Sequence, residues 1–197
     1  MVKLGCKNAK LFFTEPLSLQ IISTMSLHII IDGYNLIRQS NTLSDFDRQD
    51  IQLGRESLIN MLAVYKKIKH HKITVVFDGT NAPFLSRRRD KIKGVEIRFS
   101  RIGELADTVI KKMAAKEREK ALVVSSDLEI VNAVASQGAS TISSPMFEEK
   151  IAMAEYMSAK GVDGENKGGW IPTTKKKGPS RRLSKRARKS RLKIKKL

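Results

Sequence analysis

Cysteine, histidine and long apolar runs are scarce in this chain of 197 residues. The single cysteine, Cys6, excludes an internal disulfide and every zinc site built on several cysteines. The three histidines lack the spacing of a metal site, and no apolar run is long enough to cross a membrane. Neither a glycine-rich phosphate loop nor a nucleophile elbow is present. We therefore expect a cytoplasmic protein with no membrane partner.

Residues 1–26 carry short apolar stretches that resemble a secretion signal only superficially. Glu15 and Pro16 interrupt these stretches, and no small-residue cleavage site follows a sufficient apolar run. Met25 stands just before the first predicted strand. Our hypothesis is that residues 1–26 form an N-terminal extension that reflects an upstream start.

Acidic residues are outnumbered, since 20 Asp and Glu stand against 38 Lys and Arg, a formal net charge of +18. Residues 172–197 hold 13 of the basic residues and no acid, which leaves a net charge of +5 for residues 1–171. Such a segment buries too little apolar surface to fold alone, and it attracts phosphate backbones. The alternatives are a solvated solubility tail or, less favoured, contact with an anionic membrane surface. The tail therefore favours nucleic acid as the partner.

Short aliphatic runs alternate with helix-like spacing through the middle of the chain. Alternation of this kind indicates an α/β fold with a mostly parallel sheet and helices on both faces. The folded domain is expected to span residues 27–159, followed by a glycine-rich linker and a disordered basic tail over 160–197. The runs predict strands at 27–31, 73–77, 95–99, 121–124 and 140–143, helices at 51–71, 104–118, 127–136 and 145–159, a loop at 41–50, and a loop or short helix at 80–94.

Acidic residues follow three of the predicted strands at the point where each strand ends. Asp32, Asp78 and Asp127 come after the first, second and fourth strands. Glu104 and Asp107 stand three residues apart at the start of a predicted helix, on one helical face. Because ligand sites in open α/β sheets lie beyond the carboxyl ends of the strands, we expect these carboxylates to share one cleft.

Several carboxylates in one cleft repel one another unless cations neutralise them. Oxygen-only ligation suits Mg²⁺ or Mn²⁺, and such an ion can activate water for attack on a phosphodiester. Each acid also has a structural explanation: Asp127 and Glu104 could complement a helix dipole, and Asp78 could belong to an ordinary turn. The same residue type at three strand ends favours a shared metal site.

Polar and basic residues near these acids are candidates for substrate contact. Asn35 could hydrogen-bond the scissile phosphate or orient a carboxylate, or it could cap the segment that follows. Arg87, Arg88 and Arg89 follow Asp78 and could guide a phosphate backbone toward the acids. Alternatively, the three arginines form a solvated basic loop.

The order of these motifs resembles the YacP-like NYN-domain family, relatives of the PIN-domain nucleases. The resemblance runs through residues 29–37, 75–79, 103–107 and 123–127, the turn at 137–139 and the helix entry at 143–145, and covers nearly all of residues 27–158. It implies a PIN-like three-layer α/β/α fold with a mostly parallel central sheet. It also implies a metal-dependent ribonuclease with an acidic site formed by Asp32, Asp78, Glu104, Asp107 and Asp127.

Three positions depart from the family pattern. Leu105 stands where a small polar residue is common, Lys111 where a further acid is common, and Gly79 in place of the more usual alanine. Some relatives act on messenger RNA in association with ribosomes. The resemblance thus implies RNA, messenger or ribosomal, and the ribosome as partners.

Our hypothesis is a metal-dependent endoribonuclease in which Asp32, Asp107 and Asp127 hold Mg²⁺ or Mn²⁺. Asp78 and Glu104 would complete the shell or orient the attacking water, and Asn35 would position the substrate. The basic tail would hold structured RNA in a salt-sensitive way. The alternatives are a non-catalytic RNA- or ribosome-binding protein with a vestigial acidic site, and a phosphatase or 5′-nuclease.

Overall fold

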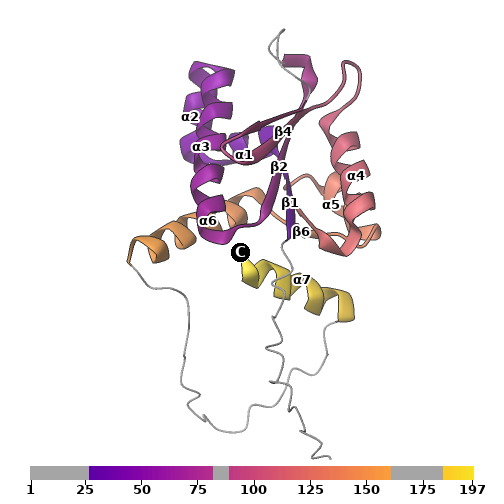
Figure 1. Ribbon diagram of the computed structural model, residues 1–197. Helices are drawn as coiled ribbons and strands as arrows, with labels where there is room; N and C mark the ends of the chain where they lie inside the picture. Colours follow the sequence, from indigo (N-terminus) through magenta and orange to yellow (C-terminus); the bar gives the residue numbers. More distant parts are fainter. Residues whose placement is uncertain (1–26, 82–88, 161–183) are drawn as a thin grey trace, which may run out of the picture.

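The computed structural model describes residues 27–81, 89–160 and 184–197, which form a six-stranded sheet with helices on both faces (Figure 1). The strand order is β3-β4-β2-β1-β5-β6, and every neighbouring pair is parallel except the antiparallel β3–β4 hairpin. The predicted α/β class and the mostly parallel sheet are therefore confirmed. The strands are β1 (His28–Asp32), β2 (Lys72–Phe77), β3 (Arg89–Ile92), β4 (Val95–Phe99), β5 (Ala121–Val124) and β6 (Ser140–Ile142).

The helices form two layers because crossovers between parallel strands are right-handed. From β1 the chain moves to β2 and β4 on one side, and α4 then carries it back to β5 on the other side. The two directions of travel place their crossover helices on opposite faces of the sheet. One face carries α1 (Gly33–Gln39), α2 (Asn41–Gln49), α3 (Ile51–Lys69) and α6 (Ser144–Ala159), and the other carries α4 (Ala106–Glu117) and α5 (Leu128–Ser136).

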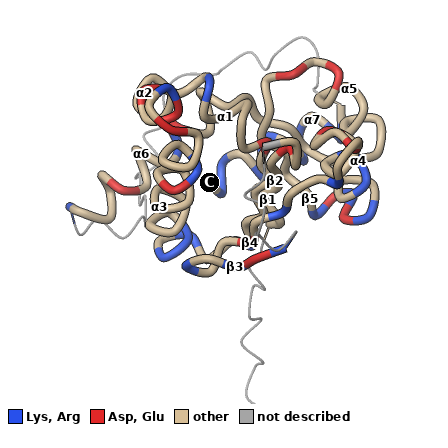
Figure 2. Tube along the Cα trace, turned by 90° about the horizontal axis from the view of Figure 1, so that it is seen from above, with Lys and Arg blue, Asp and Glu red and all other residues tan. Residues whose placement is uncertain are grey.

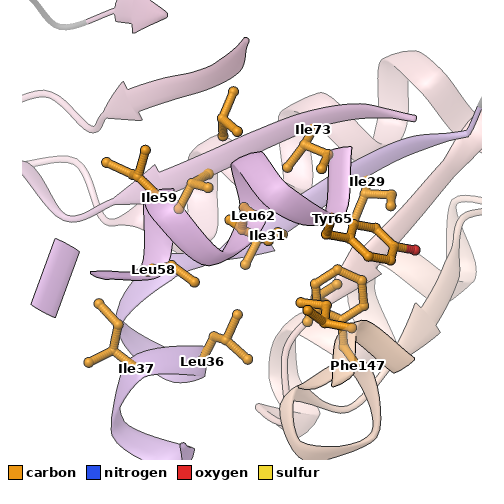
Figure 3. Packing of buried hydrophobic residues seen from close by; sticks show 14 of the residues in the cluster. Ile29, Ile31, Leu36, Ile37, Leu58, Ile59, Leu62, Tyr65, Ile73 and Phe147 are labelled. Carbon is orange, nitrogen blue, oxygen red and sulfur yellow. The ribbon is translucent and has the colours of Figure 1, made fainter. Parts of the chain in front are cut away.

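The larger part of the core lies between the sheet and the layer that contains α3 and α6 (Figure 3). Ile29 and Ile31 of β1 are fully buried there, and Tyr65 and Phe147 meet edge to face with ring centroids 5.7 Å apart. A fully buried Leu, Ile or Phe side chain contributes roughly 1.5–3 kcal/mol. This packing fixes where β1 ends, and with it the position of Asp32.

The sequence predicts a loop at residues 41–50, and this prediction is wrong because α2 occupies most of that range. Ser40 caps the helix, its Oγ accepting the Leu43 N–H at 3.2 Å. Leu43 is the buried residue of α2, and the rest of the helix is mostly polar. Apart from Leu43 and Phe46 the segment consists of polar residues, a composition that is typical of a loop, so the sequence predicted no helix there. Hairpin strand β3 likewise forms inside the predicted loop at 80–94.

The basic segment also differs from its prediction, because residues Lys185–Lys196 form helix α7 instead of a disordered tail. The Tyr65 hydroxyl donates to the Leu197 carbonyl at 3.3 Å, Leu197 is buried, and Ile194 packs against the larger core cluster. Lys189 pairs with Glu119 at 2.9 Å. These contacts place α7 beside the amino-terminal ends of the strands (Figure 1). Residues 1–26 and 161–183 lie outside the described part of the chain.

None of the helices in the described residues is long and apolar enough to span a membrane.

Candidate active site

Four aspartates from different segments of the chain line one pocket of about 570 Å³ at the carboxyl edge of the sheet. At this edge β1 lies between β2, which the chain reaches next through one helical layer, and β5, which it reaches later from β4 through α4 in the other layer. Such a reversal of strand order is the usual ligand site of open α/β sheets. Figure 2 looks down on this edge and shows acidic positions over β1 and β2. The lining residues are Asp32, Tyr34, Asn35, Arg38, Gln39, Asp78, Thr80, Leu105, Ala106, Asp107 and Asp127.

Asp32 ends β1 and caps α1, its Oδ1 accepting the Asn35 N–H at 3.2 Å. The Ser125 hydroxyl donates to Asp32 Oδ2 at 3.4 Å. Burial raises the pKa of this carboxyl to about 6; the Asn35 N–H works against the rise, and the charges of Asp107 and Asp127 add to it. Asp32 is thus a buried carboxylate that is electrostatically coupled to two other acids.

Asp127 follows β5 and caps α5, its Oδ1 accepting the Glu129 N–H at 2.7 Å. Its own N–H donates to Ser125 Oγ at 3.2 Å. Ser125 therefore contacts both Asp32 and Asp127. Asp127 is thus the N-cap of α5, one residue before the first turn, and it also lines the shared pocket, because a residue that caps a helix at a strand end faces the carboxyl edge.

Asp107 and Asp78 complete the four. Asp107 lies in the first turn of α4, where burial raises the pKa of its carboxyl; Lys111 opposes the rise and Asp127 adds to it. Asp78 Oδ1 accepts both the N–H of Thr80 at 2.8 Å and the hydroxyl of Thr80 at 2.5 Å, and these bonds lower the pKa of Asp78. Asp78 thus forms the turn that the sequence allows and also lines the pocket.

Glu104 is the one predicted acid that the structure places elsewhere. It lines a neighbouring groove and accepts from Lys112 Nζ at 2.7 Å, which lowers the pKa of its carboxyl. Lys111, one of the departures from the family pattern, pairs with Glu129 at 2.5 Å. The acidic pocket therefore holds four of the five predicted carboxylates.

The donor set of the pocket fits a hard divalent cation in chemistry, because it is made of carboxylate oxygens, and the charges of Asp107 and Asp127 add to the raised pKa of Asp32. Within residues 27–81, 89–160 and 184–197, however, no three Asp, Glu, His or Cys side chains are grouped closely enough to hold one metal ion. Mg²⁺ keeps several of its waters when it binds and needs only one or two direct carboxylates. The four aspartates fit such a partly hydrated ion better than a closed cage of ligands.

Asn35 joins three segments around the pocket. Its Oδ1 accepts the Ser126 N–H at 3.0 Å and the Ser144 hydroxyl at 2.8 Å, while Ser126 Oγ accepts the Ser144 N–H at 3.1 Å. The amide oxygen is therefore used to align the ends of β1, β5 and β6. Asn35 also lines the pocket. Of the predicted arginines, Arg89 opens β3 and lines the neighbouring groove, and Arg87 and Arg88 lie outside the described residues.

The close approach of Ser100 explains why a glycine stands at position 79. Its N–H donates to Ser100 Oγ at 2.9 Å, and a Cβ atom at this position would come within 2.1 Å of the Ser100 carbonyl oxygen. The alanine that is more usual in the family would force the backbone after Asp78 to shift. Gly79 thus lets β2 and the segment after β4 approach closely beside the pocket.

Sequence reasoning missed Tyr34, Arg38 and Ser125. Tyr34 and Arg38 are one helical turn apart on the helix that Asp32 caps, and the Arg38 guanidinium lies 5.5 Å from the Tyr34 ring centroid. The buried Arg55 donates to the Tyr34 hydroxyl through Nε at 3.0 Å and also through Nη2. The spacing of Tyr34 and Arg38 after Asp32 could have pointed to both residues, whereas nothing in the sequence pairs Arg55 with Tyr34.

A parallel sheet between two helical layers, with aspartates gathered at its carboxyl edge, defines the class of NYN-domain proteins, whose fold is PIN-like and whose members are generally nuclease-like. The chain belongs to the YacP-like NYN domain family, whose model matches residues 29–196. The resemblance predicted from the motifs is therefore confirmed.

The chain is similar to a curated protein of Bacillus subtilis (strain 168), "Uncharacterized protein YacP", with 30% identity over 86 residues. That alignment covers 44% of this chain and 50% of the relative, so the chain spans about half the length of the curated relative it matches. It is also similar to the crystal structure of Rae1 (YacP) from Bacillus subtilis, with 27% identity and a TM-score of 0.58 over 68% of this chain and 78% of that chain. A mutant form of Rae1 gives 26% identity and a TM-score of 0.57 over 68% and 80%.

Proposed function

We propose that this protein is a divalent-metal-dependent endoribonuclease that hydrolyses RNA phosphodiester bonds. The observation that carries the proposal is the pocket in which burial, with the charges of Asp107 and Asp127, raises the pKa of Asp32 to about 6. Carboxylates coupled in this way are an unfavourable arrangement for stability, and a cation removes the cost. The general nuclease-like character of NYN domains agrees with this reading.

Mg²⁺ or Mn²⁺ is the proposed cofactor, held by Asp32, Asp107 and Asp127, one or two of them directly and the others through the waters that the ion keeps. A bound ion would supply a water of lowered pKa and neutralise charge that develops on the phosphodiester. Asp78, fixed by Thr80, would orient the attacking water. Glu104 is left out of the metal set because it lies in the neighbouring groove.

Other side chains of the pocket would position the RNA. Arg38 adds a fixed cation beside the acids, held against the Tyr34 ring, and is suited to a phosphate oxygen. Asn35 keeps the ends of β1, β5 and β6 together through its amide oxygen. Its amide group would then present its N–H donors toward the substrate.

RNA is the proposed partner, messenger or ribosomal, and the ribosome is its proposed setting in the cytoplasm. Helix α7 supports a polyanionic partner, because seven of its basic side chains are exposed on a single short helix. Contacts of this kind bind phosphates without reading sequence and weaken as salt rises.

The test incubates the purified full-length protein with labelled RNA and with DNA of the same sequence, in Mg²⁺, in Mn²⁺ and in EDTA. We expect cleavage of RNA only with a divalent ion, at internal positions. Cleavage of DNA to the same extent would instead support a nuclease without preference for RNA, and cleavage in EDTA would contradict metal dependence.

A non-catalytic RNA- or ribosome-binding protein is the second candidate. Lys111 favours it, because its ammonium lies close enough to Asp107 and Asp127 to be electrostatically coupled to both. A resident cation there reduces the need for a metal ion. Binding of RNA with no cleavage under any of the ionic conditions would support this candidate and contradict the nuclease.

A further inference from the structure

A basic groove of about 770 Å³ lies beside the acidic pocket, between β4 and α4. The groove and the pocket meet in the segment before α4, where Glu104 lines the groove and Leu105 and Ala106 line the pocket. No aspartate of the pocket lines the groove. Its charged lining residues are Arg89, Arg98, Arg101, Lys112, Lys116 and Glu104.

The groove exists because α4 packs over the middle of the sheet and leaves β4 beside it. Helix α4 contacts β1, β2 and β5. Arg98 is opposite Val76 in the register of β4 with β2, and Val76 belongs to the core under α4, so Arg98 projects on the α4 side of the sheet. Arg89 is opposite Arg98 in the β3–β4 hairpin and shares that side.

The opposite wall comes from α4 itself. Lys112 and Lys116 are four residues apart, so they lie one above the other on one helical face. Both are exposed, with the Lys112 side chain 70% accessible, and Lys112 also pairs with Glu104. The half-buried Val109 and the buried Met113 form the floor of the groove between the two walls. Cations on both sides of an apolar strip suit a phosphate backbone whose bases are turned inward.

The short connection from β4 to α4 adds apolar surface at the junction of groove and pocket. Ile102 is 90% exposed and Leu105 is 65% exposed. An unpaired strand presents the apolar faces of its bases to such side chains, whereas a duplex keeps those faces stacked inside. Leu105 is also a departure from the small polar residue that is common in the family, so this contact is a property of this chain.

We propose that the groove binds an unpaired RNA strand and leads it into the acidic pocket. The inference rests on the proposed function for the identity of the pocket, and it adds the strandedness of the substrate and the residues that hold it. Arg98, Arg101, Lys112 and Lys116 contact the phosphates, and Ile102 and Leu105 contact the bases at the entrance.

The first test removes charge from the groove. Binding of a short fluorescent single-stranded RNA is measured by anisotropy in EDTA, over a range of salt, for the full-length wild type and for Lys112→Gln/Lys116→Gln. The matched control is Lys67→Gln/Lys160→Gln, which removes two exposed lysines from other surfaces. We expect the groove variant to lose more affinity than the control, with a salt slope lower by about 1.4.

The second test removes apolar surface without changing charge. We expect Ile102→Ser/Leu105→Ser to weaken single-strand binding while the salt slope stays as in the wild type, because no phosphate contact is lost. Leu53→Ser/Met153→Ser is the control, since both residues are exposed on other helices. The same RNA annealed to its complement serves as the duplex probe in both tests.

Equal loss of affinity in the groove variants and their controls would overturn the inference, and so would equal loss for the single strand and the duplex. The cleavage assay on the wild type is read separately. Selective loss of single-strand binding without any cleavage would leave the groove assignment standing and contradict the nuclease. Cleavage with no selective loss would support the nuclease and contradict the groove.

Discussion

The two edges of the central sheet carry opposite charges and are held by different means. At the carboxyl edge, Asp32 and Asp127 each cap a helix by accepting a backbone N–H, and both form a hydrogen bond with Ser125. The backbone therefore holds the two carboxylates in place. At the amino edge, α7 brings its cations against the starts of the strands through a few side-chain contacts, among them the pair Lys189–Glu119. The difference separates an acidic site that hydrogen bonds to the backbone hold in place, suited to chemistry, from a basic surface that side-chain contacts hold, suited to affinity.

The largest effect on stability is expected at Asp32 in protein without metal. Its pKa rises from 3.8 to about 6 on folding, so the folded state favours the protonated form and loses stability as pH rises through 6. Asp32→Asn keeps the cap and removes the charge, and should stabilise the protein at neutral pH by up to about 3 kcal/mol. Urea unfolding in EDTA measures the gain, which should vanish below about pH 4.

Asp78→Asn is the matched control, because it should change the free energy of unfolding in the opposite direction. The pKa of Asp78 is lowered on folding by its bonds to Thr80, so this carboxylate contributes stability that is lost as pH falls. The substitution should therefore destabilise the protein at neutral pH. If Asp32→Asn were less stable than the wild type at neutral pH, the charge of Asp32 would not be a cost to the stability of the folded protein.

Binding of a divalent ion should offset the electrostatic repulsion between the carboxylates at the acidic edge and so stabilise the folded protein. With Mn²⁺ at a hundred times its dissociation constant, the wild type should gain about 2.7 kcal/mol, seen as a rise in the melting temperature. Asp32→Asn and Asp107→Asn should lose most of this gain, and Asp45→Asn on the exposed surface of α2 should keep it. Equal stabilisation of all three variants would place the ion elsewhere.

The position of α7 at the basic edge should depend on the apolar residue Leu197 that follows the helix. Leu197 is 4% exposed, so Leu197→Ala should cost about 2 kcal/mol of unfolding free energy, the low end for a buried leucine. Leu192 on the same helix is 63% exposed, and Leu192→Ala should change stability little. Equal effects of the two substitutions in chemical unfolding would mean that α7 is not docked in solution.

The smallest effect is expected from the cations of α7 taken singly, so three are changed together. Lys185→Gln/Arg186→Gln/Arg188→Gln should lower the salt slope for structured RNA by roughly 2 to 3. The control replaces Arg48, Lys67 and Lys160 by glutamine, which removes the same charge from other surfaces. Filter binding at several salt concentrations compares the two triple variants. Equal salt slopes would show that α7 contributes no more to RNA binding than other basic surfaces do.

The acidic edge could be predicted because its signals are local. Buried parallel strands read as aliphatic runs, and the residue after each run must lie at the carboxyl edge. Asp78 follows directly from this rule, and Asp32, the last residue of β1, and Asp127, three residues after β5, lie close enough to their strand ends for the rule to hold. Asp107 was also placed correctly, because it stands in the first turn of a helix that begins at the same edge.

Glu104 shows where local signals end. It lies two residues before α4, where the path of the connection from β4 decides which side of the helix it faces. Its side chain lies in the groove, where it pairs with Lys112, and neither the spacing nor the types of the residues in the sequence predict this pair. Helix α7 was missed for a similar reason: Ile194 and Leu197 are the residues that dock it, and they stand among eight cations that read as a solvated segment.

The most direct test of the account measures cleavage and binding of one labelled RNA by the wild type, Asp32→Asn and Asp127→Asn in Mn²⁺. Asparagine caps helices as well as aspartate does, so both variants should keep the fold. We predict that cleavage falls at least about 100-fold, because the site loses several kcal/mol of charge stabilisation, while RNA affinity stays close to that of the wild type. Unchanged cleavage in both variants would contradict the assignment of chemistry to the acidic edge.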